Sequence, residues 1–159
     1  MLRYFFLPLL VIAILLSVVT SQGGGSKKKS TIAVRFHAQA DANDGEVFAS
    51  PLTVGDPPRD IYISKIPVVS ENDIASVYTF SAADGTLGAF FRLDSHGRFA
   101  LEAITVAKKG GLLVGMVNGR PATTLFIDKI IKDGVIGIPS GLTIMEIELM
   151  EKEFNKKKK

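Results

Sequence analysis

The feature that most constrains this chain is a tight turn, Asn118-Gly119, between two β-prone segments. Both residues tolerate a positive φ, which the two-residue turn of an antiparallel hairpin requires. Residues 112–117 before the turn are continuously apolar, which is typical of a central strand covered on both faces. Residues 120–125 after it supply the partner strand. The chain is therefore predicted to be built on antiparallel strand pairs.

Further strands are predicted on both sides of this hairpin. Asp84-Gly85 joins residues 76–82 to residues 87–93 as a second hairpin. Residues 31–38 alternate between apolar and other side chains, which places Ile32, Val34, Phe36 and Ala38 inside and Arg35 with His37 on a polar face. Residues 59–66 and 135–138 give two more strands. Pro51, Pro57 and Pro58 exclude a long central strand between residues 47 and 58.

Two helices complete the predicted fold. The first spans residues 97–109, is capped by Asp94 or Ser95, and buries Phe99, Ala103 and Val106. The second opens at the Thr143-x-x-Glu146 capping box and continues to about Phe154. Its predicted buried stripe contains Ile144, Ile147, Met150 and Phe154. The fold class is α+β, a mostly antiparallel sheet with two helices packed on one face.

The N-terminus indicates export. Residues 1–21 carry one charge, an apolar run and a Val19-Thr20-Ser21 end, the pattern of a signal peptide cut between Ser21 and Gln22. The alternative is a retained membrane anchor, since the run approaches the length of a spanning helix. Residues 22–30 form a flexible Gly/Ser/Lys linker, residues 31–155 a single domain, and residues 156–159 a lysine tail. The expected location is periplasmic or extracellular, or anchored in the inner membrane if the segment stays.

The charge distribution argues against a nucleic-acid-binding domain. Of nineteen Lys and Arg, removing Arg3, Lys27 to Lys29 and Lys156 to Lys159 leaves eleven against sixteen Asp and Glu, a balance of −5. A nucleic-acid-binding fold concentrates positive charge on its folded face. The lysine-rich ends allow a weak contact with a membrane surface.

No catalytic or cofactor-binding constellation is predicted. The chain has no cysteine, and His37 and His96 lack a second histidine at metal-ligand spacing, so no metal site is expected. Asp94, Ser95 and His96 include the residue types of a hydrolytic triad, but their adjacency in one turn favours helix capping.

Two groups of residues are looser candidates for binding. Asp41, Asp44 and Glu46 share a loop but lack the full ligand series of a calcium loop. The aromatic residues Tyr62, Tyr78, Phe90 and Phe91 are predicted mainly for the core, with some available to line a groove for an extended peptide. An exposed sheet edge adds such a peptide as a further strand.

The second half of the chain resembles a known family. The segments are FRLDSHG (residues 91–97) before a helix, LLVGMVNGR (112–120), DGVIGI (133–138), and Gly141-Leu142-Thr143 before an acidic helix. Their order is similar to the head of the large periplasmic domain of SecD, a protein-export membrane subunit, over residues 59–153. The resemblance implies that fold and a role in contacting proteins. The proton-coupled motor role is not implied, because the matched segments include none of the family's membrane spans.

Three functional hypotheses follow. The first is an exported, non-enzymatic domain that contacts other proteins or polypeptide chains of the cell envelope. The second is a small exported enzyme whose site gathers scattered residues such as His37, Asp94 and His96. The third is a structural module tethered by residues 1–21.

Overall fold

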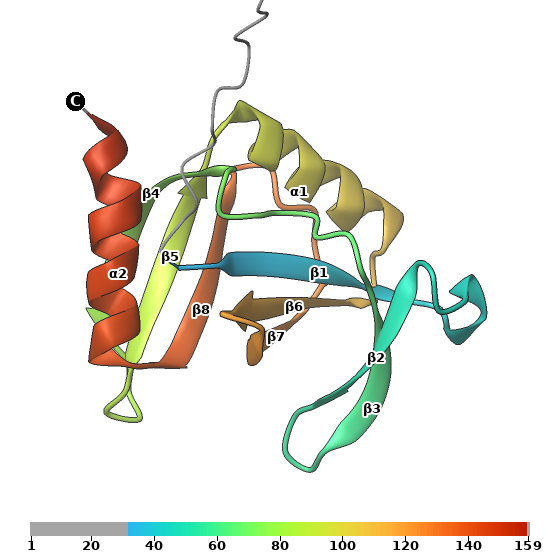
Figure 1. The fold of residues 1–159 in the computed structure, drawn as a ribbon. Coiled ribbons are helices and arrows are strands. Elements are labelled where there is room, and N and C mark those ends of the chain that lie inside the picture. Colours follow the sequence, from blue (N-terminus) through green and yellow to red (C-terminus); the bar gives the residue numbers. More distant parts are fainter. Residues whose placement is uncertain (1–31, 159) are drawn as a thin grey trace, which may run out of the picture.

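The computed structural model describes residues 32–158, which form eight strands, two α-helices and two short 3-10 helices (Figure 1). The strands are β1 (Val34–Ala40), β2 (Ala49–Val54), β3 (Arg59–Ser64), β4 (Ile74–Ser81), β5 (Leu87–Leu93), β6 (Leu112–Val117), β7 (Arg120–Phe126) and β8 (Val135–Leu142). The helices are α1 (Ser95–Ala107), α2 (Ile144–Phe154), η1 (Ala42–Asp44) and η2 (Asn155–Lys158).

The strands divide between two antiparallel sheets. One has five strands in the order β2-β3-β1-β6-β7, and the other has three in the order β4-β5-β8. All strand pairs in both sheets are antiparallel. The predicted α+β class is therefore confirmed, with the strands shared by two sheets and with β2 as an additional edge strand that the sequence did not predict.

The β6–β7 hairpin has the predicted geometry. Asn118 and Gly119 have φ values of 49° and 81°, and Val117 pairs with Arg120 across the turn. β6 lies between β1 and β7, so it is the interior strand that its apolar sequence predicts. Gly115 in β6 is required by close packing, because a Cβ there would lie 2.8 Å from both the Phe36 ring and the Thr123 methyl.

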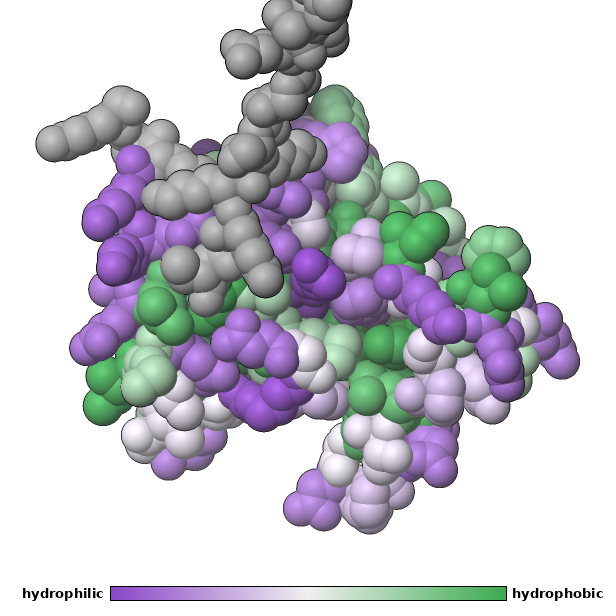
Figure 2. All heavy atoms as spheres, in the orientation of Figure 1, coloured by the Kyte–Doolittle hydropathy of each residue, from purple (hydrophilic) through white to green (hydrophobic). Residues whose placement is uncertain are grey.

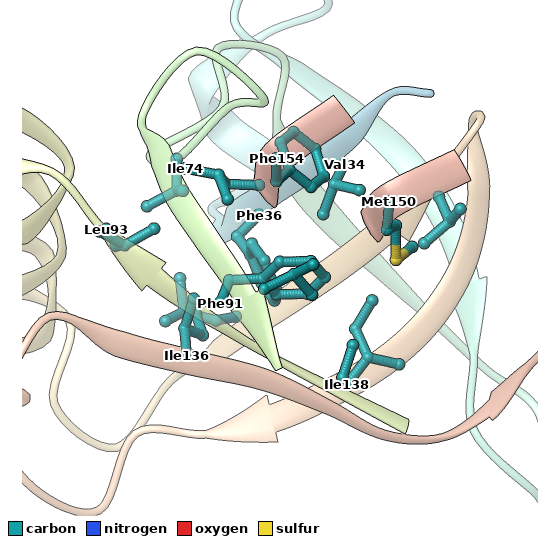
Figure 3. Packing of buried hydrophobic residues seen from close by; sticks show 14 of the residues in the cluster. Val34, Phe36, Ile74, Phe91, Leu93, Ile136, Ile138, Met150 and Phe154 are labelled. Atoms are coloured by element: carbon teal, nitrogen blue, oxygen red, sulfur yellow. The ribbon is translucent and has the colours of Figure 1, made fainter. Parts of the chain in front are cut away.

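The main core lies between the two sheets (Figure 3). Phe91 of β5 is at its centre and packs edge-on against Phe36 of β1, with ring centroids 6.1 Å apart. Phe91 also packs against Phe154 of α2 at 6.3 Å and a right angle. Edge-to-face contacts of this kind stabilise beyond simple area burial. These two aromatic contacts thus connect the five-stranded sheet, the three-stranded sheet and α2.

Helix α2 begins at the predicted capping box. Thr143 Oγ1 accepts from the Glu146 amide at 3.2 Å, and Glu146 Oε2 accepts from the Thr143 amide at 2.9 Å. Ile147, Met150 and Phe154 are buried as predicted, whereas Ile144 is exposed. The first position of the helix therefore lies outside the stripe that contacts the core.

Helix α1 has the predicted cap and length, but it begins and ends two residues earlier than predicted and buries a different face. Gly97, Leu101 and Thr105 contact the core, while the predicted Phe99, Ala103 and Val106 face solvent. Gly97 is needed at this contact because a Cβ there would lie 2.8 Å from the Asp73 Cβ. Thr105 is tolerated inside because its hydroxyl donates to the Leu101 carbonyl and accepts from the Ile131 amide.

The predicted signal segment with its Ser21–Gln22 cut, the linker at residues 22–30 and the last lysine lie outside the described residues. Within residues 32–158, no helix is long and apolar enough to cross a membrane.

Candidate functional site: a groove between two strand edges

The five-stranded sheet carries a second, smaller core on the face away from the main core. Val54, Ile61, Ile63 and Val114 are buried there, with Leu52, Leu112 and Met116 packed against them. These residues come from β2, β3 and β6. Because β2 is the first strand of the sheet and β6 the fourth, this packing requires the β2–β3 hairpin to curl over the sheet.

The curl brings the two opposite edges of the five-stranded sheet to one groove. Thr53, Val54 and Gly55 line it from the β2 side, and residues 121–124 line it from β7. The groove has a volume of about 480 Å³. In Figure 2, a notch at the bottom of the molecule separates the β2–β3 hairpin from the rest of the surface.

Both walls of the groove are edge strands, which leave one row of backbone amides and carbonyls without a partner strand. Each of these two strands contains a proline, Pro51 in β2 and Pro121 in β7, and Pro121 lines the groove itself. Proline in a sheet is confined to such edge positions because it cannot donate to the ladder. Threonine hydroxyls add polar groups, and that of Thr53 donates to Asp60 at 2.6 Å. The groove therefore offers backbone hydrogen bonding with few charges on its walls.

A smaller hollow of about 190 Å³ lies on the same sheet face, beside Ala33, Arg35, His37 and Met116. Arg35 pairs with Met116 and His37 with Val114 across β1 and β6, so their side chains share the face of the second core. Arg35 makes a bidentate ion pair with Glu71 at 3.1 and 3.2 Å. Burial opposes ionisation of Glu71, but the hydrogen bonds and the charge of Arg35 outweigh it and lower the Glu71 pKa.

His37 departs from its predicted solvent position. It is 8% exposed, and its Nδ1 lies 2.7 Å from the Ser64 carbonyl oxygen. The curled hairpin covers it, since Ser64 ends β3. The alternating sequence of β1 predicts a polar, solvent-facing side for His37. In the structure this side of the strand faces the second core.

His96 lies in a different region, at the start of α1. Its Nδ1 is 2.8 Å from Asp73 Oδ1, while Asp94 Oδ1 accepts from the Gly97 amide at 2.9 Å. Within the described residues, Asp73, Asp94 and His96 could share an ion, because their ligand atoms lie within 4.8 Å of one another. Each carboxylate is already used: Asp94 caps α1, and Asp73 Oδ2 accepts from the amide and hydroxyl of Ser70. The capping role predicted for Asp94 is confirmed.

The remaining predicted candidates have local or surface roles. Asp41 and Asp44 form a capping box within η1, so their carboxylates bind amides of their own turn. Phe91 is a core residue as predicted, whereas Tyr62, Tyr78 and Phe90 are exposed. Tyr78 and Phe90 face each other across β4 and β5, on the side of the three-stranded sheet away from Phe91.

The groove residues are not singled out by the sequence. Thr53 and Thr123 have no distinctive chemistry, and their proximity depends on how far the β2–β3 hairpin curls. The prolines in β2 and β7 are the available signal, because they mark both strands as edges.

No family model and no curated protein matches the sequence. The solved structures that are similar in fold include two of SecDF. One is of a membrane component SecDF that enhances protein export, with a TM-score of 0.55 and 15% identity over 77% of this chain. The other is SecDF in a super-membrane-facing form, with a TM-score of 0.54 and 16% identity over 76%. This chain spans 61% of the first structure and 18% of the second. The predicted resemblance to a SecD domain is confirmed at the level of the fold.

Proposed function

We propose that this chain is an exported, non-enzymatic domain that binds an extended segment of another polypeptide in the groove between β2 and β7. The observation that carries the proposal is that two strand edges of one sheet line the same groove. A polypeptide entering it gains main-chain hydrogen bonds of the kind made in strand addition. The proposal that the chain itself is exported rests on the signal predicted at residues 1–21. The fold that it shares with a protein-export component supports a polypeptide as its partner.

The arrangement of titratable residues also favours binding over catalysis. His37 is held at the Ser64 carbonyl under the β2–β3 hairpin, whereas Asp94 and His96 lie at the start of α1. Of the three residues of the enzyme hypothesis, Asp94 and His96 lie close together, but His37 lies apart from them. Asp94 is used for helix capping and does not point to a reaction.

Hydrogen exchange of the purified chain tests this proposal. A permanently unfolded, alkylated protein is titrated in, and amide exchange is followed by mass spectrometry. We expect slower exchange in peptides covering both β2 and β7, because an added strand protects edge amides. Replacing the exposed Thr53 by Arg puts a long charged side chain in the groove and should remove this protection.

The matched control is Ala83→Arg, which adds the same charge at an exposed position in the β4–β5 loop. This variant should retain protection of β2 and β7. The proposal is wrong if saturating unfolded protein protects neither edge, or if Thr53→Arg is protected as strongly as the unmodified chain.

A further inference from the structure

Helix α1 presents an apolar stripe to solvent. Phe99 is 62% exposed and Val106 is 56% exposed, and Ala103 lies between them on the same side. These residues lie opposite Gly97, Leu101 and Thr105, the face that contacts the core. The helix is therefore apolar on two sides, although a surface helix of a soluble domain normally needs one apolar face.

The segment after β7 runs beside α1 in the opposite direction. The Gly110 amide donates to the Ile127 carbonyl, the Ile131 amide donates to Thr105 Oγ1, and Gly134 lies against the Arg98 side chain. Ile130 of this segment is also an exposed apolar residue. Figure 2 shows apolar atoms gathered along the side of the molecule where α1 lies.

Positive charges border this surface. Arg98 lies over the Phe99 ring at 5.4 Å, and Lys108 and Lys109 follow the helix. Lys129 and Lys132 lie on the adjacent segment, so five exposed cations flank the stripe. Glu102, Asp128 and Asp133 are the acidic residues of α1 and this segment, which leaves the local balance positive. The folded body outside the lysine-rich ends is negative at −5, so this surface contrasts in charge with the rest.

We propose that this surface, Phe99, Ala103, Val106 and Ile130 with the five flanking cations, docks on an anionic lipid bilayer. Apolar side chains bordered by Lys and Arg are the composition of helices that lie in the membrane interface. Basic residues close to anionic headgroups add electrostatic attraction. The apolar stripe alone would suit a protein partner, whereas stripe and flanking cations together match the apolar interior and anionic headgroups of a bilayer. The predicted apolar segment at residues 1–21 also brings the chain to a membrane, either during export or as an anchor.

This inference concerns a different surface from the β2–β7 groove and goes beyond the proposed function. It gives the acidic body one orientation on a membrane, with α1 towards the lipid. The two proposals can therefore be refuted independently. Strand addition is tested by hydrogen exchange at β2 and β7, and lipid docking by fluorescence at α1.

Tryptophan fluorescence of the full chain tests the inference, because the sequence contains no tryptophan. Phe99→Trp places a single probe at an exposed position, so folding should be unaffected. Vesicles of zwitterionic lipid with or without anionic lipid are prepared with brominated acyl chains. We expect a blue shift and strong quenching only with anionic vesicles, and loss of most of the quenching when Lys108 and Lys109 are both replaced by Gln.

Tyr78→Trp is the matched control, because Tyr78 is 69% exposed on the three-stranded sheet. Its emission should not respond to vesicles. The proposal is overturned if Phe99→Trp is not quenched by anionic vesicles, or if the two variants are quenched equally. A blue shift of Phe99→Trp with lipid-free envelope protein but not with vesicles also overturns it, in favour of a protein partner.

Discussion

At the scale of single residues, Asp73 connects three parts of the chain. Its Oδ2 accepts from the amide and hydroxyl of Ser70, and its Oδ1 contacts His96 at the start of α1. Its backbone carbonyl accepts from the Asp94 amide. Partial burial opposes ionisation of the carboxylate, but the hydrogen bonds from Ser70 and His96 outweigh it and hold the Asp73 pKa below its usual value.

The lowered Asp73 pKa predicts a specific acid sensitivity. A carboxyl whose pKa is depressed on folding stabilises the fold above its unfolded pKa, and this stabilisation is lost as the pH falls through the folded value. We expect Asp73→Asn to lower the free energy of unfolding by about 1.5–3 kcal/mol at pH 7, the range for hydrogen bonds to charged groups. The difference from the unmodified chain should shrink towards zero as the pH falls below about 4. Urea unfolding at several pH values measures it.

Asp84→Asn is the control for this pH dependence. Hydrogen bonds from Thr86 also lower the pKa of Asp84, but this carboxylate is fully exposed on the β4–β5 turn. Its replacement should change acid stability much less, because solvent screens an exposed charge. A pH-independent loss in Asp73→Asn would show that packing, and not ionisation, explains the role of Asp73.

At the scale of elements, the start of α1 distinguishes a helix cap from a reactive site. We expect Asp94→Ala to lower the free energy of unfolding by about 1 kcal/mol, because the Gly97 amide loses its acceptor. Asp94→Ser should recover most of that loss, since serine is an equally good N-cap. Thermal or urea unfolding of the three chains measures the difference. If serine is as damaging as alanine, the carboxylate has a role besides capping, such as holding an ion with Asp73 and His96.

The extent of the helices was predictable from the sequence, but not the face of α1. Capping signals are local, so Asp94 and Thr143 marked both helix starts. The buried face depends on distant partners: the close approach of Asp73 requires Gly97, and the amide of Ile131 satisfies Thr105. The spacing of apolar residues along the helix predicts instead that Phe99 and Val106 are buried, but both face solvent.

At the scale of the whole molecule, hairpins were predictable and their assembly was not. Asn118-Gly119 and Asp84-Gly85 fixed two hairpins through turns that need a positive φ. The division into two sheets depends on β1 pairing with both β3 and β6, contacts far apart in the sequence. The groove between β2 and β7 is a consequence of this assembly, and so is the burial of His37.

The edge strands of the two sheets differ in how well they are protected from pairing with another strand. Residues of β2 and β7, the edge strands of the five-stranded sheet, line the groove, whereas β4, an edge of the three-stranded sheet, lies against α2 (Figure 1). The outward amide of Val77 in β4 donates to Asn155 Oδ1 at 3.1 Å, just after α2. Thr79 of β4 donates to Glu151 at 2.6 Å. The end of α2 thus occupies the Val77 amide, a backbone group that another strand could otherwise use.

This protection predicts that Asn155 limits self-association. Asn155→Ala leaves the Val77 amide without its acceptor, which should lower the free energy of unfolding by about 1 kcal/mol. A freed edge amide also favours pairing with a second chain, so the mass measured by light scattering should rise with concentration more steeply than for the unmodified protein. Lys156→Ala changes the neighbouring exposed residue and should alter neither property. If both variants behave alike, β4 is protected by the packing of α2 alone, and the Asn155 side chain has no part in keeping that edge closed.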